Sequence, residues 1–167
     1  MRFVYYTDKS VAQCMTALNA RMQAKPSASR PALDGWVEKS GGFSLSTSCR
    51  VARYFTRRTH LRAAAIREEG LTVIRGYVPD GASREGQAVI FGALLLVCLA
   101  LVGSGNSLPA VIVVLAAAAL YIPLTGDHAN SAILLSEVQK TLGAKATPPK
   151  QAAKTNRARS TVSQRVR

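Results

Sequence analysis

Two apolar runs decide the fold of this chain: Gln87-Ala-Val-Ile-Phe-Gly-Ala-Leu-Leu-Leu-Val-Cys-Leu-Ala-Leu-Val102 and Leu108-Pro-Ala-Val-Ile-Val-Val-Leu-Ala-Ala-Ala-Ala-Leu-Tyr-Ile-Pro-Leu124. No Asp, Glu, Lys, Arg or His lies between Glu85 and Asp127, although charged residues are frequent on both sides. A helix needs about 20 residues to cross a hydrocarbon core of roughly 30 Å, and each run approaches that length with its Gly, Ser or Thr flanks. The sequence therefore predicts a transmembrane helical hairpin over residues 87–125, turned by Gly103-Ser-Gly-Asn-Ser107.

A helical hairpin buried inside a soluble protein is the alternative to a membrane hairpin. A surface helix carries a charged stripe opposite its apolar face, whereas these two runs are apolar on all sides. A soluble domain of this size has too little other material to cover both helices, so we expect lipid around them. Small residues at 116–119 and Gly92 would allow close approach between spans, within one chain or in a homo-oligomer.

The positive charges predict the orientation of the hairpin. Lys and Arg outnumber the acids on both sides of the uncharged segment, and the connecting turn has no charge. Because Lys and Arg near membrane ends are retained in the cytoplasm, we expect a two-pass protein of the cytoplasmic (inner) membrane with both termini cytoplasmic.

Residues 1–86 have the pattern of a cytoplasmic α+β domain. Arg2-Phe-Val-Tyr-Tyr-Thr7 is dense in aromatic and β-branched residues and predicts a first strand. A helix follows, with Thr7 as the expected N-cap and Pro26 ending it. Its buried stripe is predicted from apolar residues at three-to-four-residue spacing: Val11, Cys14, Met15, Leu18 and Met22.

Two strand pairs are predicted in the rest of this domain. Residues 35–39 and 43–49 flank Ser40-Gly-Gly42, which is a hairpin signal. Residues 60–67 and 71–78 flank Glu68-Glu-Gly70, although the Ala-rich first limb also suits a helix.

Beyond the uncharged segment, the sequence predicts an amphipathic helix and then a tail. Leu134, Val138 and Leu142 recur one turn apart within residues 126–143, and Gly126 and Asp127 are expected to separate this helix from the second span. We expect the helix to dock on the sheet; the alternative is a helix lying on the lipid surface. Residues 144–167 are basic, rich in small and polar residues, and predicted to be disordered. The expected fold is thus α+β: a small antiparallel sheet with one N-terminal and one C-terminal amphipathic helix, a two-helix transmembrane hairpin and a disordered basic tail.

The net charge of +13 favours an anionic partner. In residues 50–62, Arg side chains are interleaved with aromatic ones, and this mixture suits lipid headgroups, as does the basic tail. Each Lys or Arg near an anionic leaflet contributes about 1 kcal/mol to membrane binding. Nucleic acid is the alternative partner, since guanidinium groups and aromatic faces also suit phosphates and bases. The residues predicted to contact anionic lipid or phosphate are Arg50, Arg53, Arg57, Arg58, Arg62, Lys150, Lys154, Arg157 and Arg159.

The sequence contains no recognisable catalytic, cofactor-binding or metal-binding motif. His60 and His128 have no partner at ligand spacing, and there is no Walker-type phosphate loop. Cys14, Cys49 and Cys98 are far apart and odd in number, which is typical of small buried side chains in a reducing compartment. We therefore expect no enzyme activity and no cofactor.

The segment Leu61-Arg-Ala-Ala-Ala-Ile-Arg-Glu-Glu-Gly-Leu-Thr-Val-Ile-Arg-Gly-Tyr77, followed by a membrane hairpin and an amphipathic helix, resembles small uncharacterised bacterial membrane proteins. In those proteins a strand pair of the type x-Gly-x-Ile-x-x-x-Gly-Gly-Thr-x-Ile-x-Gly precedes two spans, and this chain has Ala64 or Ala65 where the first glycine is expected. The resemblance implies the architecture and a bacterial source, and no activity. Three hypotheses of function follow: a membrane-anchored binding or adaptor module for an unidentified protein or anionic lipid, a membrane-tethered nucleic-acid binder, and a holin-like pore.

Overall fold

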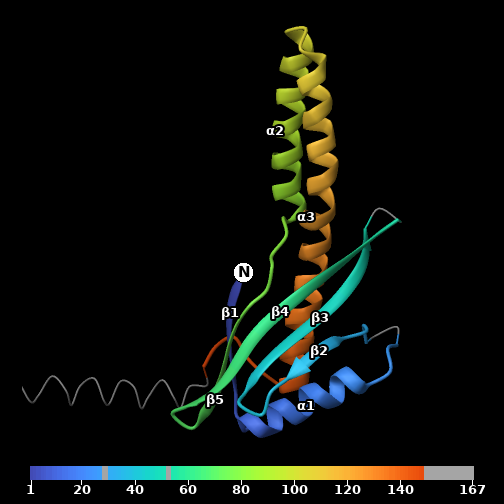
Figure 1. Ribbon diagram of the computed structural model, residues 1–167. Coiled ribbons are helices and arrows are strands. Elements are labelled where there is room, and N and C mark those ends of the chain that lie inside the picture. Colours follow the sequence, from blue (N-terminus) through green and yellow to red (C-terminus); the bar gives the residue numbers. More distant parts are fainter. Residues whose placement is uncertain (28–29, 52–53, 149–167) are drawn as a thin grey trace, which may run out of the picture. The chain divides into compact units, whose positions relative to one another are not determined.

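The computed structural model describes residues 1–27, 30–51 and 54–148 (Figure 1). In chain order the elements are β1 (Arg2–Thr7), α1 (Val11–Gln23), β2 (Asp34–Val37), β3 (Gly42–Val51), β4 (Phe55–Glu68), β5 (Leu71–Tyr77), α2 (Arg84–Gly103) and α3 (Ser107–Leu142). The strands form one sheet in the order β1-β5-β4-β3-β2, and β5 pairs antiparallel with both β1 and β4. The predicted α+β class with a small antiparallel sheet is confirmed.

Turn chemistry explains why the Ala-rich segment is a strand rather than a helix. Glu68 pairs with Leu71, so Glu69 and Gly70 form a two-residue turn with φ of 48° and 85°. Two successive positive φ angles give the turn type whose twist matches that of the flanking strands. Ala65 is also held from its other side, where its N–H donates to the carbonyl of Gly41 at 2.9 Å. The helical alternative for this segment is therefore wrong.

Helix α1 begins three residues later than a cap at Thr7 would give. Ser10 is the N-cap, and its hydroxyl and the Gln13 side chain form a reciprocal capping box. Thr7 instead donates its hydroxyl to the carbonyl of Leu142 at 2.9 Å, which ties β1 to the end of α3. The predicted buried stripe is present at Cys14, Met15 and Leu18, whereas Val11 and Met22 at its two ends are only half-buried.

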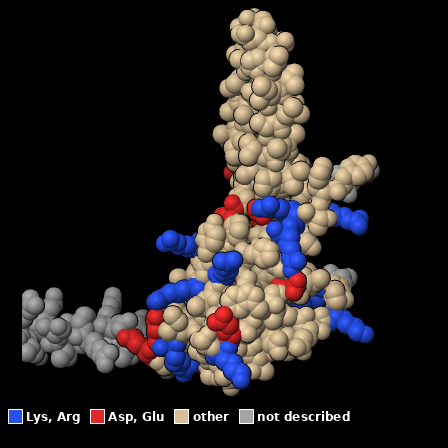
Figure 2. All heavy atoms as spheres, viewed as in Figure 1, with Lys and Arg blue, Asp and Glu red and all other residues tan. Residues whose placement is uncertain are grey.

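Helix α2 and the first part of α3 are long, apolar and uncovered. At 1.5 Å per residue, the 20 residues of α2 rise about 30 Å, which matches a hydrocarbon core. Large apolar side chains are exposed along both helices, among them Leu96 and Leu115 at 69% and 65%. Beyond Arg84 and Glu85 in the first turn of α2, the hairpin has no Lys, Arg, Asp or Glu, and its protruding part in Figure 2 shows neither blue nor red side chains. Both helices are long and apolar enough to cross a membrane, and 0% and 6% of their most apolar windows are buried, which favours spans over core helices of a soluble protein.

The second span and the amphipathic helix are one continuous helix, which corrects the expected separation at Gly126 and Asp127. Helix α3 has 36 residues and rises about 54 Å, more than one membrane thickness. Its first 20 residues end at Gly126, and the remainder carries Leu134, Val138 and Leu142, each 0% exposed. These three side chains are buried, and the docking of this part on the sheet stays a prediction. Gly143, with φ of 61°, ends the helix as the sequence predicts.

The start of the basic tail is ordered, contrary to the prediction for residues 144–167. Lys145 pairs with Tyr6 of β1 through two backbone hydrogen bonds of 2.8 and 2.9 Å, and Ala144 is buried. Residues 149–167 lie outside the described part of the chain.

The chain divides into two compact units. The first contains Met1 with residues 46–61 and 78–134, that is, the α2–α3 hairpin and the parts of β3 and β4 next to residues 52–53. The second contains residues 2–45 and 62–77 and the chain from Leu135 onward. Within the second unit, the buried side chains of Phe3, Leu18, Phe43, Ile74 and Val138 form the core. Residues that precede and follow the hairpin in the sequence, such as Tyr6 and Lys145, are bonded to each other within this unit.

Candidate functional site

The membrane-length part of α3 ends at a carboxylate that is fully engaged by strand β4. Asp127 is the first charged residue after the uncharged segment, and its side chain is 9% exposed. Arg57 donates from Nε to Oδ1 at 2.9 Å and from Nη2 to Oδ2 at 2.6 Å. Thr59 donates its hydroxyl to Oδ1 at 2.6 Å. Because Arg57 is 39% exposed on its side chain, the pair lies at the edge of the folded unit rather than deep inside it.

Asn130 extends this network by one turn of α3. Its amide nitrogen donates to the backbone carbonyl of Arg57 at 2.9 Å and to the hydroxyl of Thr59 at 3.0 Å. Asn130 and Thr59 are both buried, at 0% and 1% exposure. A buried polar group is costly unless it is hydrogen-bonded, so these bonds specify which residues of helix and strand face each other. We call Arg57, Thr59, Asp127 and Asn130 the anchor cluster.

The anchor cluster keeps its carboxylate ionised. Burial would raise the pKa of Asp127, but the hydrogen bonds from Arg57 and Thr59 and the charge of Arg57 outweigh it and lower the pKa below its usual value. The hydrogen bond to Asp127 raises the pKa of Arg57. A carboxylate that is saturated by donors and has a lowered pKa is a poor general base. The chemistry of the cluster is therefore that of a fixed ion pair.

Two glycines let backbone segments approach α3 beside this cluster. A Cβ atom on Gly126 would lie 2.6 Å from Arg57 and 3.1 Å from a methyl of Val51. A Cβ atom on Gly81 would lie 2.0 Å from the carbonyl oxygen of Leu124. The neighbouring Ala82 donates its N–H to that same carbonyl at 3.2 Å, so the segment that enters α2 is fixed to α3 where the span ends.

Cys49 lies against the same part of α3 as a protonated thiol. Burial raises its pKa, the negative charge of Asp127 raises it further, and a hydrogen bond with Asn130 acts in the opposite direction. The thiol donates to the carbonyl of Gly126 at 3.7 Å. A thiol with a raised pKa is a weak nucleophile.

The structure separates the basic residues that the sequence grouped together. Arg57 faces α3 and is paired with Asp127, whereas Arg58, on the opposite face of β4, is exposed and donates to the hydroxyl of Ser46 at 3.1 and 2.9 Å. Arg50 is exposed in the same unit as Arg58, and Arg62 is exposed in the other unit. The remaining predicted contacts lie outside the described residues: Arg53, Lys150, Lys154, Arg157 and Arg159.

Sequence reasoning missed the anchor cluster, although one signal for it was present. Asp127 directly follows the uncharged segment that ends at Gly126, and an isolated acid beside an expected membrane span needs a partner. Its partner Arg57 is 70 residues away, and no local pattern indicates that distance. In the described ranges, no group of three or more His, Cys, Asp or Glu side chains is placed to hold a metal ion.

No family model, no curated protein and no solved structure matches this chain. The resemblance to small bacterial membrane proteins therefore stays a prediction, and the function has to be argued from the residues themselves.

Proposed function

We propose that this chain is a membrane-anchored binding module whose folded part is held at the cytoplasmic face of the inner membrane and contacts anionic lipid headgroups there. The observation that carries the proposal is the direct continuation of a membrane-length apolar helix into a helix that is bonded to the sheet. Since α3 continues from residue 107 to residue 142, its membrane-length part and the anchor-cluster residues Asp127 and Asn130 belong to one helix.

Because helix α3 is continuous, charged groups of the first unit lie close to the end of its membrane-length part. Asp127 directly follows the uncharged segment of the chain, which ends at Gly126, and Arg84 and Glu85 open α2. The parts of β3 and β4 that pack on α3 in this unit carry Arg50 and Arg58 with exposed side chains. Each cation near an anionic leaflet contributes about 1 kcal/mol, so these side chains favour an anionic membrane surface.

The pairing of Arg57 sharpens this proposal. Its charge is compensated by Asp127, so Arg57 anchors α3 and the lipid contacts fall to Arg50 and Arg58. The proposed role in binding extends to a protein partner recruited at the same surface and to homo-oligomers formed through the spans, as the sequence suggests. Catalysis has no part in the proposal.

Lipid retention by the full-length protein tests the proposal. The protein is extracted from membranes that contain phosphatidylglycerol and phosphatidylcholine, and the lipids that co-purify are quantified by mass spectrometry. We expect enrichment of phosphatidylglycerol in the wild type and loss of that enrichment in the double variant Arg50→Gln, Arg58→Gln. Lys39→Gln, which removes an exposed charge from the β2–β3 turn in the other unit, is the matched control. Equal lipid composition in all three proteins would contradict the proposal.

The same preparations distinguish the nucleic-acid alternative. Nonspecific binding to phosphates weakens steeply with salt, by roughly a thousandfold or more between low and moderate ionic strength for several contacts. Oligonucleotide binding that persists at moderate salt, together with no lipid preference, would replace the lipid proposal by the nucleic-acid one. Dye leakage from vesicles that contain the protein would instead support the pore.

A further inference from the structure

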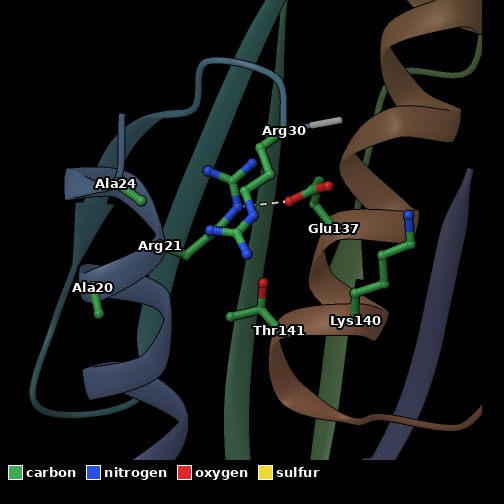
Figure 3. A pocket seen from close by; sticks show the side chains of 7 residues that line it. All are labelled: Ala20, Arg21, Ala24, Arg30, Glu137, Lys140 and Thr141. Carbon is green, nitrogen blue, oxygen red and sulfur yellow. Dashed lines mark hydrogen bonds and ion pairs between the residues drawn. The ribbon is translucent and has the colours of Figure 1, made fainter. Parts of the chain in front are cut away.

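A basic cavity of about 500 Å³ lies in the second unit, between α1 and the last turns of α3 (Figure 3). The polar groups lining it are Arg21, Arg30, Glu137, Lys140 and Thr141, and alanines of α1 form part of its wall. Its volume falls within the range of about 300–1,000 Å³ that is typical of small-molecule sites. None of the functions considered above accounts for a charged cavity at this place.

Arg21 is positioned by two bonds and has donor capacity left over. Its Nε donates to Oε2 of Glu137 at 2.7 Å, and its Nη2 donates to the carbonyl of Pro31 at 3.0 Å. The side chains of Arg21 and Glu137 are only 11% and 8% exposed. Nη1 of Arg21 is buried and has no hydrogen-bond partner among the described residues. A buried charged donor without a partner is costly, and an anion in the cavity would remove that cost.

Arg30 brings a second guanidinium to the same place. Its backbone is fixed by two reciprocal hydrogen bonds with Ser27, of 2.9 and 3.0 Å. Arg21 and Arg30 line the same cavity, and in Figure 3 the side chains of both extend into it, with the bond from Arg21 to Glu137 drawn as a dashed line. Like charges that line one cavity repel each other, and the single carboxylate of Glu137 compensates only one of them.

The remaining polar lining comes from the last turns of α3. Thr141 points its side chain toward the two arginines, whereas Lys140 lies at the side of the cavity with its ammonium turned away from them (Figure 3). The flexible stem of a lysine lets its ammonium turn toward a bound anion. Three cations and one acid give a net lining charge of 3 − 1 = +2.

We propose that this cavity binds a phosphate monoester group. A net charge of +2 matches the dianion that a phosphate monoester forms above its second pKa of about 6. Planar guanidinium groups donate to phosphate oxygens in pairs, and the unpaired Nη1 of Arg21 provides the buried donor. The inference is independent of lipid binding by Arg50 and Arg58, which belong to the other unit.

Calorimetric titration of the full-length protein in phosphatidylcholine nanodiscs tests the proposal, with inorganic phosphate and glycerol 3-phosphate as the ligands. We expect saturable binding that weakens roughly tenfold or more in Arg30→Gln, since a hydrogen bond between charged groups is lost. Arg30 is exposed and outside helices and strands, so this variant should fold, whereas loss of Arg21 would also leave Glu137 buried and unpaired. Arg62→Gln removes an equally exposed charge outside the cavity and should bind as the wild type does.

A second set of nanodiscs that contain phosphatidic acid identifies the source of the phosphate. Retention of phosphatidic acid that is lost in Arg30→Gln, without binding of the two soluble phosphates, assigns the cavity to a lipid headgroup. Binding of the soluble phosphates alone assigns it to a soluble metabolite. Absence of both, or equal binding by the wild type and Arg30→Gln, would overturn the proposal.

Discussion

Gly126 of α3 and Arg57 of β4 approach each other so closely that a Cβ atom on the glycine would lie 2.6 Å from both Cβ and Cγ of the arginine. No real side chain tolerates such a contact without movement of the helix or the strand. The missing side chain therefore sets the distance between α3 and β4, and that distance allows Arg57 to bond both oxygens of the adjacent Asp127. The anchor cluster therefore depends on Gly126, because the absence of a Cβ atom there permits the close approach of α3 and β4.

Gly126→Ala should destabilise the folded protein by about 2 kcal/mol, because an added methyl forces adjustments typical of overpacked sites. Gly92→Ala is the matched control. Gly92 also lies within a helix, but a Cβ atom there would meet nothing within 4 Å. Thermal unfolding of the detergent-solubilised proteins should show a lower Tm for the first variant and an unchanged or higher Tm for the second. An equal Tm for Gly126→Ala and the wild type would show that the close approach has no energetic consequence.

The anchor cluster should make stability depend on acid pH through Asp127. Its pKa is lowered in the folded protein, whereas in the unfolded chain it is about 3.9. The carboxylate therefore stabilises the fold fully above the unfolded value, and this contribution is lost as the pH falls through the lower folded value. Asp127→Asn should be less stable near neutral pH, and its disadvantage should shrink below about pH 4. Tm measured against pH for both proteins checks this, and parallel curves would contradict it.

Local sequence patterns predicted most of the fold but did not predict the anchor cluster. The alternating strands and the turn at Glu69 and Gly70 are encoded in neighbouring residues, so their positions followed from the sequence. The predicted helix break at Gly126 and Asp127 was wrong for a physical reason. Both residues disfavour helices by their intrinsic propensity, which suggests a break, but here the glycine serves close packing and the acid serves an ion pair. Tertiary contacts with β4 outweigh a propensity cost of about 1 kcal/mol.

The basic cavity could not be predicted from the sequence because its lining residues are far apart along the chain. Glu137 lies 116 residues from its partner Arg21, and no spacing rule connects a helix near the N-terminus with the last turns of α3. Arg30 stands in a stretch that reads only as a Pro- and Ser-containing loop. The folded chain brings the three together, as Figure 3 shows.

The buried pair of Arg21 and Glu137 should matter more to stability than the exposed pair of Arg75 and Glu68. Glu137→Gln leaves a guanidinium that is 11% exposed without its counter-charge, and we expect a loss of about 3 kcal/mol. Glu68→Gln breaks a pair whose side chains are 57% and 38% exposed, and we expect a change within about 1 kcal/mol. Both substitutions replace a carboxylate by an amide of the same shape, so thermal unfolding of the two variants compares burial directly. Similar losses in both would show that the salt bridge between Arg21 and Glu137 is not shielded from water.

Charges introduced along α3 should reveal where the lipid ends. Leu115 lies near the middle of the uncharged part of α3 and is exposed, so Leu115→Arg would place a cation at the centre of the bilayer at a cost of about 3 kcal/mol. Ala129 is exposed on the same helix beyond Asp127, and Ala129→Arg should carry no such cost. Expressed at equal levels, the wild type and Ala129→Arg should remain in the membrane fraction after alkaline extraction, and Leu115→Arg should be partly released or degraded. Release of the wild type itself would refute the membrane assignment, because a helix solvated by lipid tails cannot leave the bilayer when the pH alone is changed.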